Sequence, residues 1–212
     1  ILIEDIQNNK FNIINFYERR SRRILPALFF VMIVCIPLSV YFLPPDELED
    51  FFQSILAVTF FSSNFLFWRE NGYFDSEAIQ KPLLHTWSLA IEEQYYLLFP
   101  IFLLIIWKFG RNKVFWIILF FTIISFLISE WGWRNKPTPN FLLAPSRAWE
   151  LLAGSLCAFL VKSRGIKSNN ILSSIGILMI TISIFIYDHK TPFPSFFTLL
   201  PVIGVVLLVL YT

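Results

Sequence analysis

Long apolar stretches recur along this 212-residue chain, and they constrain its fold more than any other feature. A helix needs about 20 apolar residues to cross the roughly 30 Å hydrocarbon core of a bilayer. Because lipid offers no hydrogen-bond partners to the backbone, segments that cross it in this way are helical. Six stretches of roughly this length are the candidate spans: 24–43, 87–107, 114–131, 147–162, 171–188 and 195–212. The sequence therefore predicts an all-α fold, a polytopic transmembrane bundle of about six spans.

A seventh apolar stretch, residues 51–68, is ambiguous, and the distribution of positive charge decides how we interpret it. Eleven of the 17 lysines and arginines fall in three clusters, which lie before residue 24, at 108–113 and at 162–167. The positive-inside rule places these clusters on the cytoplasmic side, so an even number of crossings must separate the first two. Two spans already do so, and residues 51–68 should not cross. Its Gln, Ser and Asn residues fit a re-entrant or interfacial helical segment on the outer side.

The balance of apolar and charged residues indicates the surroundings of the chain and the classes of partner that it excludes. It is 56% hydrophobic and only 15% charged, which excludes an ordinary soluble domain and makes the lipid bilayer its surroundings. The net charge of +2 is too small to indicate a nucleic-acid partner. We find no pattern of metal ligands. The chain begins at Ile1 and ends in an apolar run, so we expect one membrane domain over residues 1–212, truncated at both ends.

One membrane segment, "PLLHTWSLAIEEQYYLLFP", carries unexpected polar residues. At about 100° per residue, a helix over this segment would place His85, Ser88, Glu92 and Tyr96 within an arc of roughly 80°, with Glu93 about 100° from Glu92. Ionised groups inside a bilayer are costly, so both carboxylates are expected to face a cavity or a partner. Two interpretations stay open: acid–base chemistry by Glu92 or His85, or structural pairing of the carboxylates with arginines.

A self-contained Ser-His-Glu triad is excluded within this segment. His85 and Glu92 are seven residues apart, or about 10.5 Å along a helix axis. In a triad the His contacts both of the other groups directly. Any acid–base partner of His85 or Glu92 must therefore come from another part of the fold.

Two further groups of charged residues have both a structural and a functional interpretation. The basic group before the first span anchors the topology, but arginine forks also bind phosphates, which suits a nucleotide-like or anionic-lipid ligand on the cytoplasmic side. Its members are Arg19, Arg20, Arg22 and Arg23. In "PSRAWELLAG", Arg147 and Glu150 lie three residues apart at the start of a span. They form an ion pair within the helix, or one of them meets Glu92 or Glu93.

Taken together, these motifs resemble one family. "FYERRSRRILPAL", "FFSSNFLFW", "GYFD", the polar membrane segment and "PSRAWELLAG" follow one another, within roughly residues 14–160, as they do in the acyltransferase-3 family of integral-membrane O-acyltransferases. The resemblance implies transfer of an acyl group, typically acetyl, from cytoplasmic acyl-CoA to a hydroxyl of an exported glycan or glycolipid such as lipopolysaccharide or peptidoglycan. It also implies a multi-pass protein of the bacterial inner membrane, with acyl-CoA as a co-substrate and no tightly bound cofactor.

The resemblance also implies roles for individual residues. The four arginines fit the family's Arg-x-x-Arg element in two registers, which implies contact of Arg19, Arg20, Arg22 and Arg23 with the acyl donor. Glu92 and His85 are the candidate catalytic residues, and the remaining candidates have substrate-binding or structural roles: Ser88, Glu93, Tyr96, Arg147 and Glu150. The family's principal catalytic His lies in a first helix that this chain does not include, so we expect the chain alone to be inactive. A membrane transporter or a structural membrane subunit is the alternative.

Overall fold

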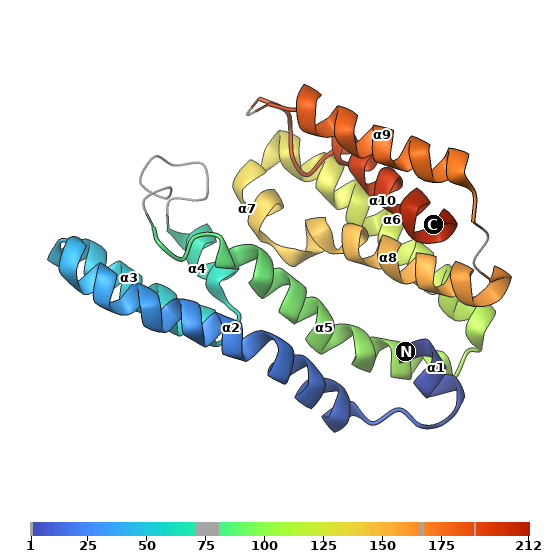
Figure 1. Cartoon of the computed structure of the whole chain (residues 1–212), viewed down its shortest axis with the longest axis horizontal. Helices are drawn as coiled ribbons and strands as arrows, with labels where there is room; N and C mark the ends of the chain where they lie inside the picture. The colour runs from blue at the N-terminus through green and yellow to red at the C-terminus, as the bar shows by residue number, and fades with distance from the viewer. Residues whose placement is uncertain (1, 71–80, 166–167, 189) are drawn as a thin grey trace. The chain divides into compact units, whose positions relative to one another are not determined.

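The chain is entirely helical in its regular secondary structure over the residues that the computed structural model describes, which are 2–70, 81–165, 168–188 and 190–212 (Figure 1). It divides into two compact units, Ile1–Ile105 and Ile106–Thr212. The predicted all-α class is therefore confirmed.

Three helices are both long enough and apolar enough to cross a membrane: α2 (Ile13–Phe42), α5 (Thr86–Trp107) and α6 (Arg111–Asn135). Two more expected spans correspond to shorter apolar helices, α9 (Asn170–Ile186) and the 3-10 helix η2 (Phe196–Thr198) continued by α10 (Leu199–Tyr211). The sixth corresponds to α8 (Ala144–Arg164), whose first turns carry charged residues. This set of helices fits the predicted membrane bundle.

In the N-terminal unit, the short helix α1 (Leu2–Gln7) precedes α2, which begins well before residue 24. The Asn12 side chain caps α2 by accepting hydrogen bonds from the backbone N–H groups of Ile14 and Asn15, at 2.9 and 3.1 Å. The helix ends at Phe42, ahead of Pro44 and Pro45. With 30 residues, α2 is about 45 Å long. The helix therefore begins before the expected span 24–43 and includes the four arginines that precede that span.

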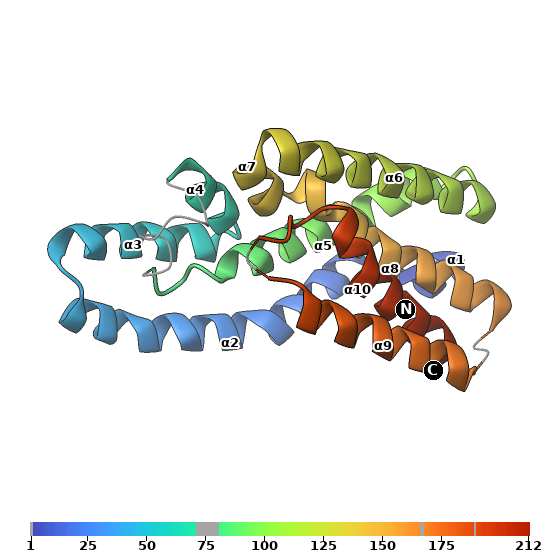
Figure 2. The ribbon, with the colours of Figure 1, turned by 90° about the horizontal axis from the view of Figure 1, so that it is seen from above.

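The ambiguous stretch 51–68 forms parts of two helices, α3 (Pro45–Thr59) and α4 (Ser63–Arg69). The break between them includes Phe61, whose φ of 51° cannot continue an α-helix. Neither helix has the roughly 20 residues of a spanning helix, in agreement with the predicted re-entrant or interfacial segment. α3 lies beside α2 in both ribbon views (Figures 1 and 2). The two helices and the turn before Thr86 share a core that consists of Leu28, Met32, Phe51, Val58 and Leu83.

Polar contacts fasten α4 and the residues before α5 to the rest of this unit. Gln94 of α5 donates from Nε2 to the Phe61 carbonyl and to Oδ1 of the fully buried Asn64, both at 2.9 Å. Lys81 forms ion pairs with Glu70, and with Asp50 at 3.3 Å. These contacts hold the start of α5 against α3 and α4.

In the C-terminal unit, α6 packs on α8, and α9 packs on α10, as Figure 2 shows. α9 and α10 approach each other through two glycines. A Cβ atom on Gly176 would lie 2.7 Å from the Gly204 carbonyl oxygen, and a Cβ atom on Gly204 would lie 2.8 Å from the Gly176 carbonyl oxygen. Small residues allow this close backbone approach, which is a common way for membrane helices to pack.

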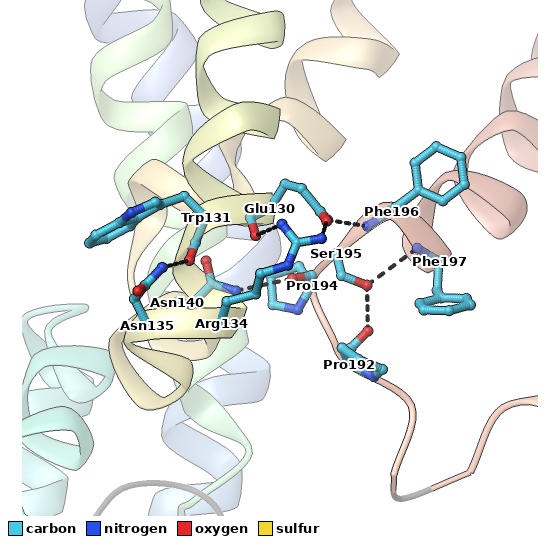
Figure 3. Close-up of polar contacts among 10 residues, drawn as sticks. All are labelled: Glu130, Trp131, Arg134, Asn135, Asn140, Pro192, Pro194, Ser195, Phe196 and Phe197. Atoms are coloured by element: carbon cyan, nitrogen blue, oxygen red, sulfur yellow. Dashed lines mark hydrogen bonds and ion pairs between the residues drawn. The ribbon is translucent and has the colours of Figure 1, made fainter.

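A polar junction ties α6 and α7 (Pro137–Leu142) to the segment that leads into α10 (Figure 3). Glu130 accepts a hydrogen bond from the Phe196 backbone N–H at 2.9 Å and also pairs with Arg134. The buried Asn140 donates from Nδ2 to the Pro194 carbonyl at 3.0 Å. Both contacts cross more than 50 residues of sequence, so they fix the path of the chain before α10.

Candidate functional site

Three of the residues that the sequence singled out in the N-terminal unit meet where α2 crosses α5, namely Arg20, Glu93 and Tyr96. Tyr17 donates a hydrogen bond from its hydroxyl to the Leu97 carbonyl at 2.7 Å. Three residues further along α2, Nη2 of Arg20 lies 2.7 Å from Oε1 of Glu93. As the residue number rises along α2 from Tyr17 to Arg20, the residue number of the partner on α5 falls from Leu97 to Glu93. The two helices therefore run antiparallel here.

Arg20 and Glu93 form a two-pronged ion pair that is largely shielded from solvent. In addition to the Nη2 contact, Nε of Arg20 lies 3.2 and 3.3 Å from the two carboxylate oxygens. The side chains are 20% and 11% exposed. The guanidinium carbon lies 3.1 Å from the centre of the Tyr96 ring, so the ring covers the face of the arginine. Paired forks of this kind are the strongest geometry for an arginine and a carboxylate. We call Arg20, Glu93 and Tyr96 the clamp.

The clamp fixes the level of the arginines along α5. Glu93 lies seven residues after the start of α5, or about 10.5 Å along its axis. Arg20 of α2 contacts it at that level. The sequence predicts the arginines just before one span and the carboxylates within another, and pairing with arginines is one of the two open interpretations of the carboxylates. The contact of Arg20 with Glu93 confirms this pairing for Glu93. The two groups of residues belong to one site.

Helix geometry then assigns each neighbour of the clamp to a side of the α2–α5 pair. Viewed along α2 from its N-terminus, successive residues turn clockwise by about 100°, and along the antiparallel α5 they turn the opposite way. With Arg20 and Glu93 facing each other, Arg19 and Arg23 lie about 100° and 60° to one side. On α5, Glu92 lies about 100° to that same side.

The opposite side of the helix pair is covered within this unit. Gln94, one residue after Glu93, points there and holds α4, and Leu28 and Met32 of α2 pack there on α3. The first side carries Arg19, Arg23, Ser88 and Glu92, all of them exposed. We call these four residues the polar face.

Arg22 is directed away from both the clamp and the polar face. It forms an ion pair with Glu18 one turn earlier at 2.8 Å, and the two side chains are 79% and 51% exposed. Of the four arginines that the family resemblance implied as donor ligands, one is therefore in the clamp, one is in an exposed ion pair, and Arg19 and Arg23 are on the polar face.

His85 does not share the helical arc predicted for it. α5 begins at Thr86, after Pro82 and a turn, so His85 lies just before the helix and is exposed. Its carbonyl accepts a hydrogen bond from Ser88 Oγ at 3.2 Å. Ser88, Glu92 and Tyr96 keep their predicted spacing along α5, and the Tyr96 ring also covers the guanidinium of Arg20. The predicted arc of four residues is reduced to these three.

In the C-terminal unit, the expected ion pair within α8 is present. Nη2 of Arg147 lies 3.4 Å from Oε2 of Glu150, and these side chains are 12% and 22% exposed. The guanidinium carbon lies 5.3 Å from the Phe141 ring centre and 4.9 Å from that of Phe193. Arg147 therefore joins the start of α8 to α7 and to the segment before α10. A contact of this pair with Glu92 or Glu93 stays a prediction.

Several residues that build the site were missed from the sequence. Tyr17 and Gln94 are not among the candidates that the sequence gives, yet each makes a hydrogen bond that connects two helices. Gln94 directly follows the two carboxylates, and that adjacency was the available signal. Within the described ranges, no group of three His, Cys, Asp or Glu side chains is gathered as metal ligands would be.

Comparisons with known proteins agree with the motifs. The family model described as an acyltransferase domain, Acyl_transf_3, matches residues 6–212. A protein of Haemophilus influenzae without a functional name is 35% identical over 222 residues, covering 99% of this chain and 91% of that protein. The peptidoglycan O-acetyltransferase OatA of Listeria monocytogenes is 33% identical over 161 residues, covering 72% of this chain. The O-acetyltransferase OatA of Staphylococcus aureus is 36% identical over 102 residues, covering 48% of it.

The similarity covers only a part of the two O-acetyltransferases. The matched region is 25% of the Listeria enzyme and 17% of the Staphylococcus enzyme. No solved structure matches the chain. Because the family model covers nearly the whole sequence and the motifs lie in the family's order, the chain belongs to the acyltransferase-3 family of membrane-bound O-acyltransferases.

Proposed function

We propose that this chain is part of an enzyme that transfers an acetyl group from acyl-CoA to a hydroxyl of an envelope glycan. The family match over residues 6–212 carries this proposal. The Listeria relative, a peptidoglycan O-acetyltransferase, supports peptidoglycan as the class of acceptor, whereas lipopolysaccharide rests on the motif resemblance alone. The distribution of basic residues supports donor binding from the cytoplasm and an acceptor on the outer side of the bacterial inner membrane.

The reaction requires three kinds of group near the reacting atoms. The acceptor oxygen bonds to the acyl carbonyl carbon, the carbon–sulfur bond breaks, and the hydroxyl proton passes to the departing thiolate of CoA. A base must take that proton, hydrogen-bond donors must stabilise the oxyanion, and cations must bind the donor phosphates. In this proposal Glu92 accepts a hydrogen bond from the acceptor hydroxyl, His85 lies at the acceptor end of α5, and arginines of α2 bind the donor.

The test measures transfer by the intact membrane protein in a host that lacks its own glycan O-acetyltransferase. Membrane vesicles receive acetyl-CoA labelled in the acetyl group, and the label is recovered from purified glycan by mild base, which cleaves esters. Glu92→Gln removes the negative charge of the polar face. Glu47→Gln is the matched control, because Glu47 is an exposed carboxylate on α3, away from the polar face.

We expect labelled glycan from the wild type and from Glu47→Gln, and at least a tenfold loss with Glu92→Gln at an unchanged protein level. Absence of transfer by the wild type would overturn the enzymatic proposal in favour of a transporter or a structural subunit. Full transfer by Glu92→Gln would remove Glu92 from the chemistry. A fall in protein level alone would give Glu92 a structural role.

A further inference from the structure

We infer that the clamp divides the arginine group into two functions: Arg20 positions the helices, and Arg19 with Arg23 binds the donor phosphates on the polar face beside Glu92. The inference rests on the proposed function and deepens it. It also separates the two adjacent carboxylates, since Glu93 is bound inside the clamp and Glu92 is on the polar face.

Arg20 has two of its three guanidinium nitrogens committed to Glu93. Nε and Nη2 contact Glu93, and the Tyr96 ring covers the guanidinium plane. A phosphate that took Arg20 would leave Glu93 without its partner at a position where that side chain is 11% exposed. Removing one member of a shielded ion pair is strongly unfavourable, because the other charge stays desolvated. Arg20 is therefore a positioning residue that sets the register of α2 against α5.

Arg19 and Arg23, unlike Arg20, leave their guanidinium groups available to a ligand. Neither has an ion-pair partner within the part of the chain that the structure describes, and both side chains are exposed. They are four residues apart on a helix, so their Cβ atoms are about 6 Å apart. Two forks at that spacing suit the adjacent phosphates of a diphosphate, and acyl-CoA contains such a diphosphate.

The position of Glu92 follows from the same register. One residue before Glu93, it emerges from α5 on the side of Arg19 and Arg23. The other side of the pair is occupied by α3 and α4. A donor held by the two arginines thus lies along the face that presents Glu92 and Ser88. The clamp itself need not contact the substrate to matter, because it sets which side chains share this face.

The first experiment exchanges the charges of the clamp in the intact membrane protein. Arg20→Glu and Glu93→Arg each place two like charges together, and the double variant restores an opposite pair. We expect each single variant to lose at least tenfold in kcat and to unfold at a lower temperature in detergent. The double variant should regain most of both, with the KM for acetyl-CoA within threefold of the wild type. Glu18→Gln, which removes the partner of the exposed Arg22, is the matched control and should change neither quantity.

The second experiment addresses the donor site. Arg19→Ala combined with Arg23→Ala should raise the KM for acetyl-CoA, and the Kd for free CoA, at least tenfold without lowering the unfolding temperature. Arg22→Ala should leave both constants within threefold of the wild type. Free CoA is a probe of binding that does not depend on turnover.

The outcomes separate this inference from the function on which it rests. If the wild type neither transfers acetyl nor binds CoA, the proposed function fails. If the wild type is active but the exchanged pair stays inactive with a raised KM and a normal unfolding temperature, Arg20 contacts the donor and the division of functions is wrong. Unchanged CoA binding after loss of Arg19 and Arg23 would also overturn it.

Discussion

Replacing Gly132 by alanine should destabilise the C-terminal unit, because the glycine leaves room for a buried side chain. A Cβ atom on Gly132 would lie 2.7 Å from Cγ of Asn140 and closer still to its Oδ1. Asn140 cannot move aside easily. It is 4% exposed, its Nδ2 donates to the Pro194 carbonyl at 3.0 Å, and its own carbonyl accepts from Ser146 Oγ at 2.6 Å.

Two costs contribute to the expected loss of stability. Overpacking of a filled site costs about 1–3 kcal/mol. If Asn140 turns away, the buried Pro194 carbonyl loses its donor, at a cost of about 1–3 kcal/mol. Against these costs, alanine stabilises a helix by about 0.5–1 kcal/mol relative to glycine. The net loss in the free energy of unfolding is therefore about 1–5 kcal/mol, which corresponds to a fall in Tm of at least about 2 °C for a chain of this size.

The matched control is Gly154→Ala in α8, where no heavy atom would lie within 4 Å of the added Cβ. This variant should gain about 0.5–1 kcal/mol from helix propensity alone. Thermal unfolding of both variants in the same detergent gives the comparison. The double variant Gly132→Ala, Asn140→Ala should cost no more than Asn140→Ala by itself, since the two costs involve the same atoms. A Gly132→Ala protein as stable as Gly154→Ala would refute the close contact.

Two further changes test other contacts. Gly204→Val places a side chain against the Gly176 carbonyl and should separate α9 from α10, seen as faster hydrogen exchange in α10 and a lower Tm, whereas a wild-type exchange pattern would contradict the packing. For Lys81, burial lowers the pKa, but the hydrogen bond and charge of Glu70 outweigh it, with a smaller contribution from Asp50, and the pKa lies above its usual 10.5. Its contribution to stability is therefore complete below about pH 10.5 and is lost as the pH rises through the folded-state value. Glu70→Gln should lower that pKa and weaken this loss at alkaline pH, as measured by denaturation across the pH range.

The sequence by itself determined the class of this protein. Apolar stretches of spanning length indicate membrane helices because the bilayer imposes their length and their backbone hydrogen bonding, whatever their neighbours are. The two prolines after Phe42 mark the end of α2, and the polar residues within 51–68 indicate that the stretch does not span as one helix. The family motifs could be recognised for the same reason, since each is a local pattern of residue types in a fixed order.

Only the tertiary structure decided how the polar residues are grouped. Helical spacing separates Glu92 from Glu93 by about 100° but does not say which of them meets an arginine, and the four arginines fit the family element in two registers. The distinction comes from the contact of Arg20 with Glu93 across 73 residues, which fixes the register of α2 on α5. Once two helices are locked by one directional, shielded ion pair, the helical turn of about 100° assigns every neighbour to a side. That assignment depends on the other helix, and no periodicity within one helix contains it.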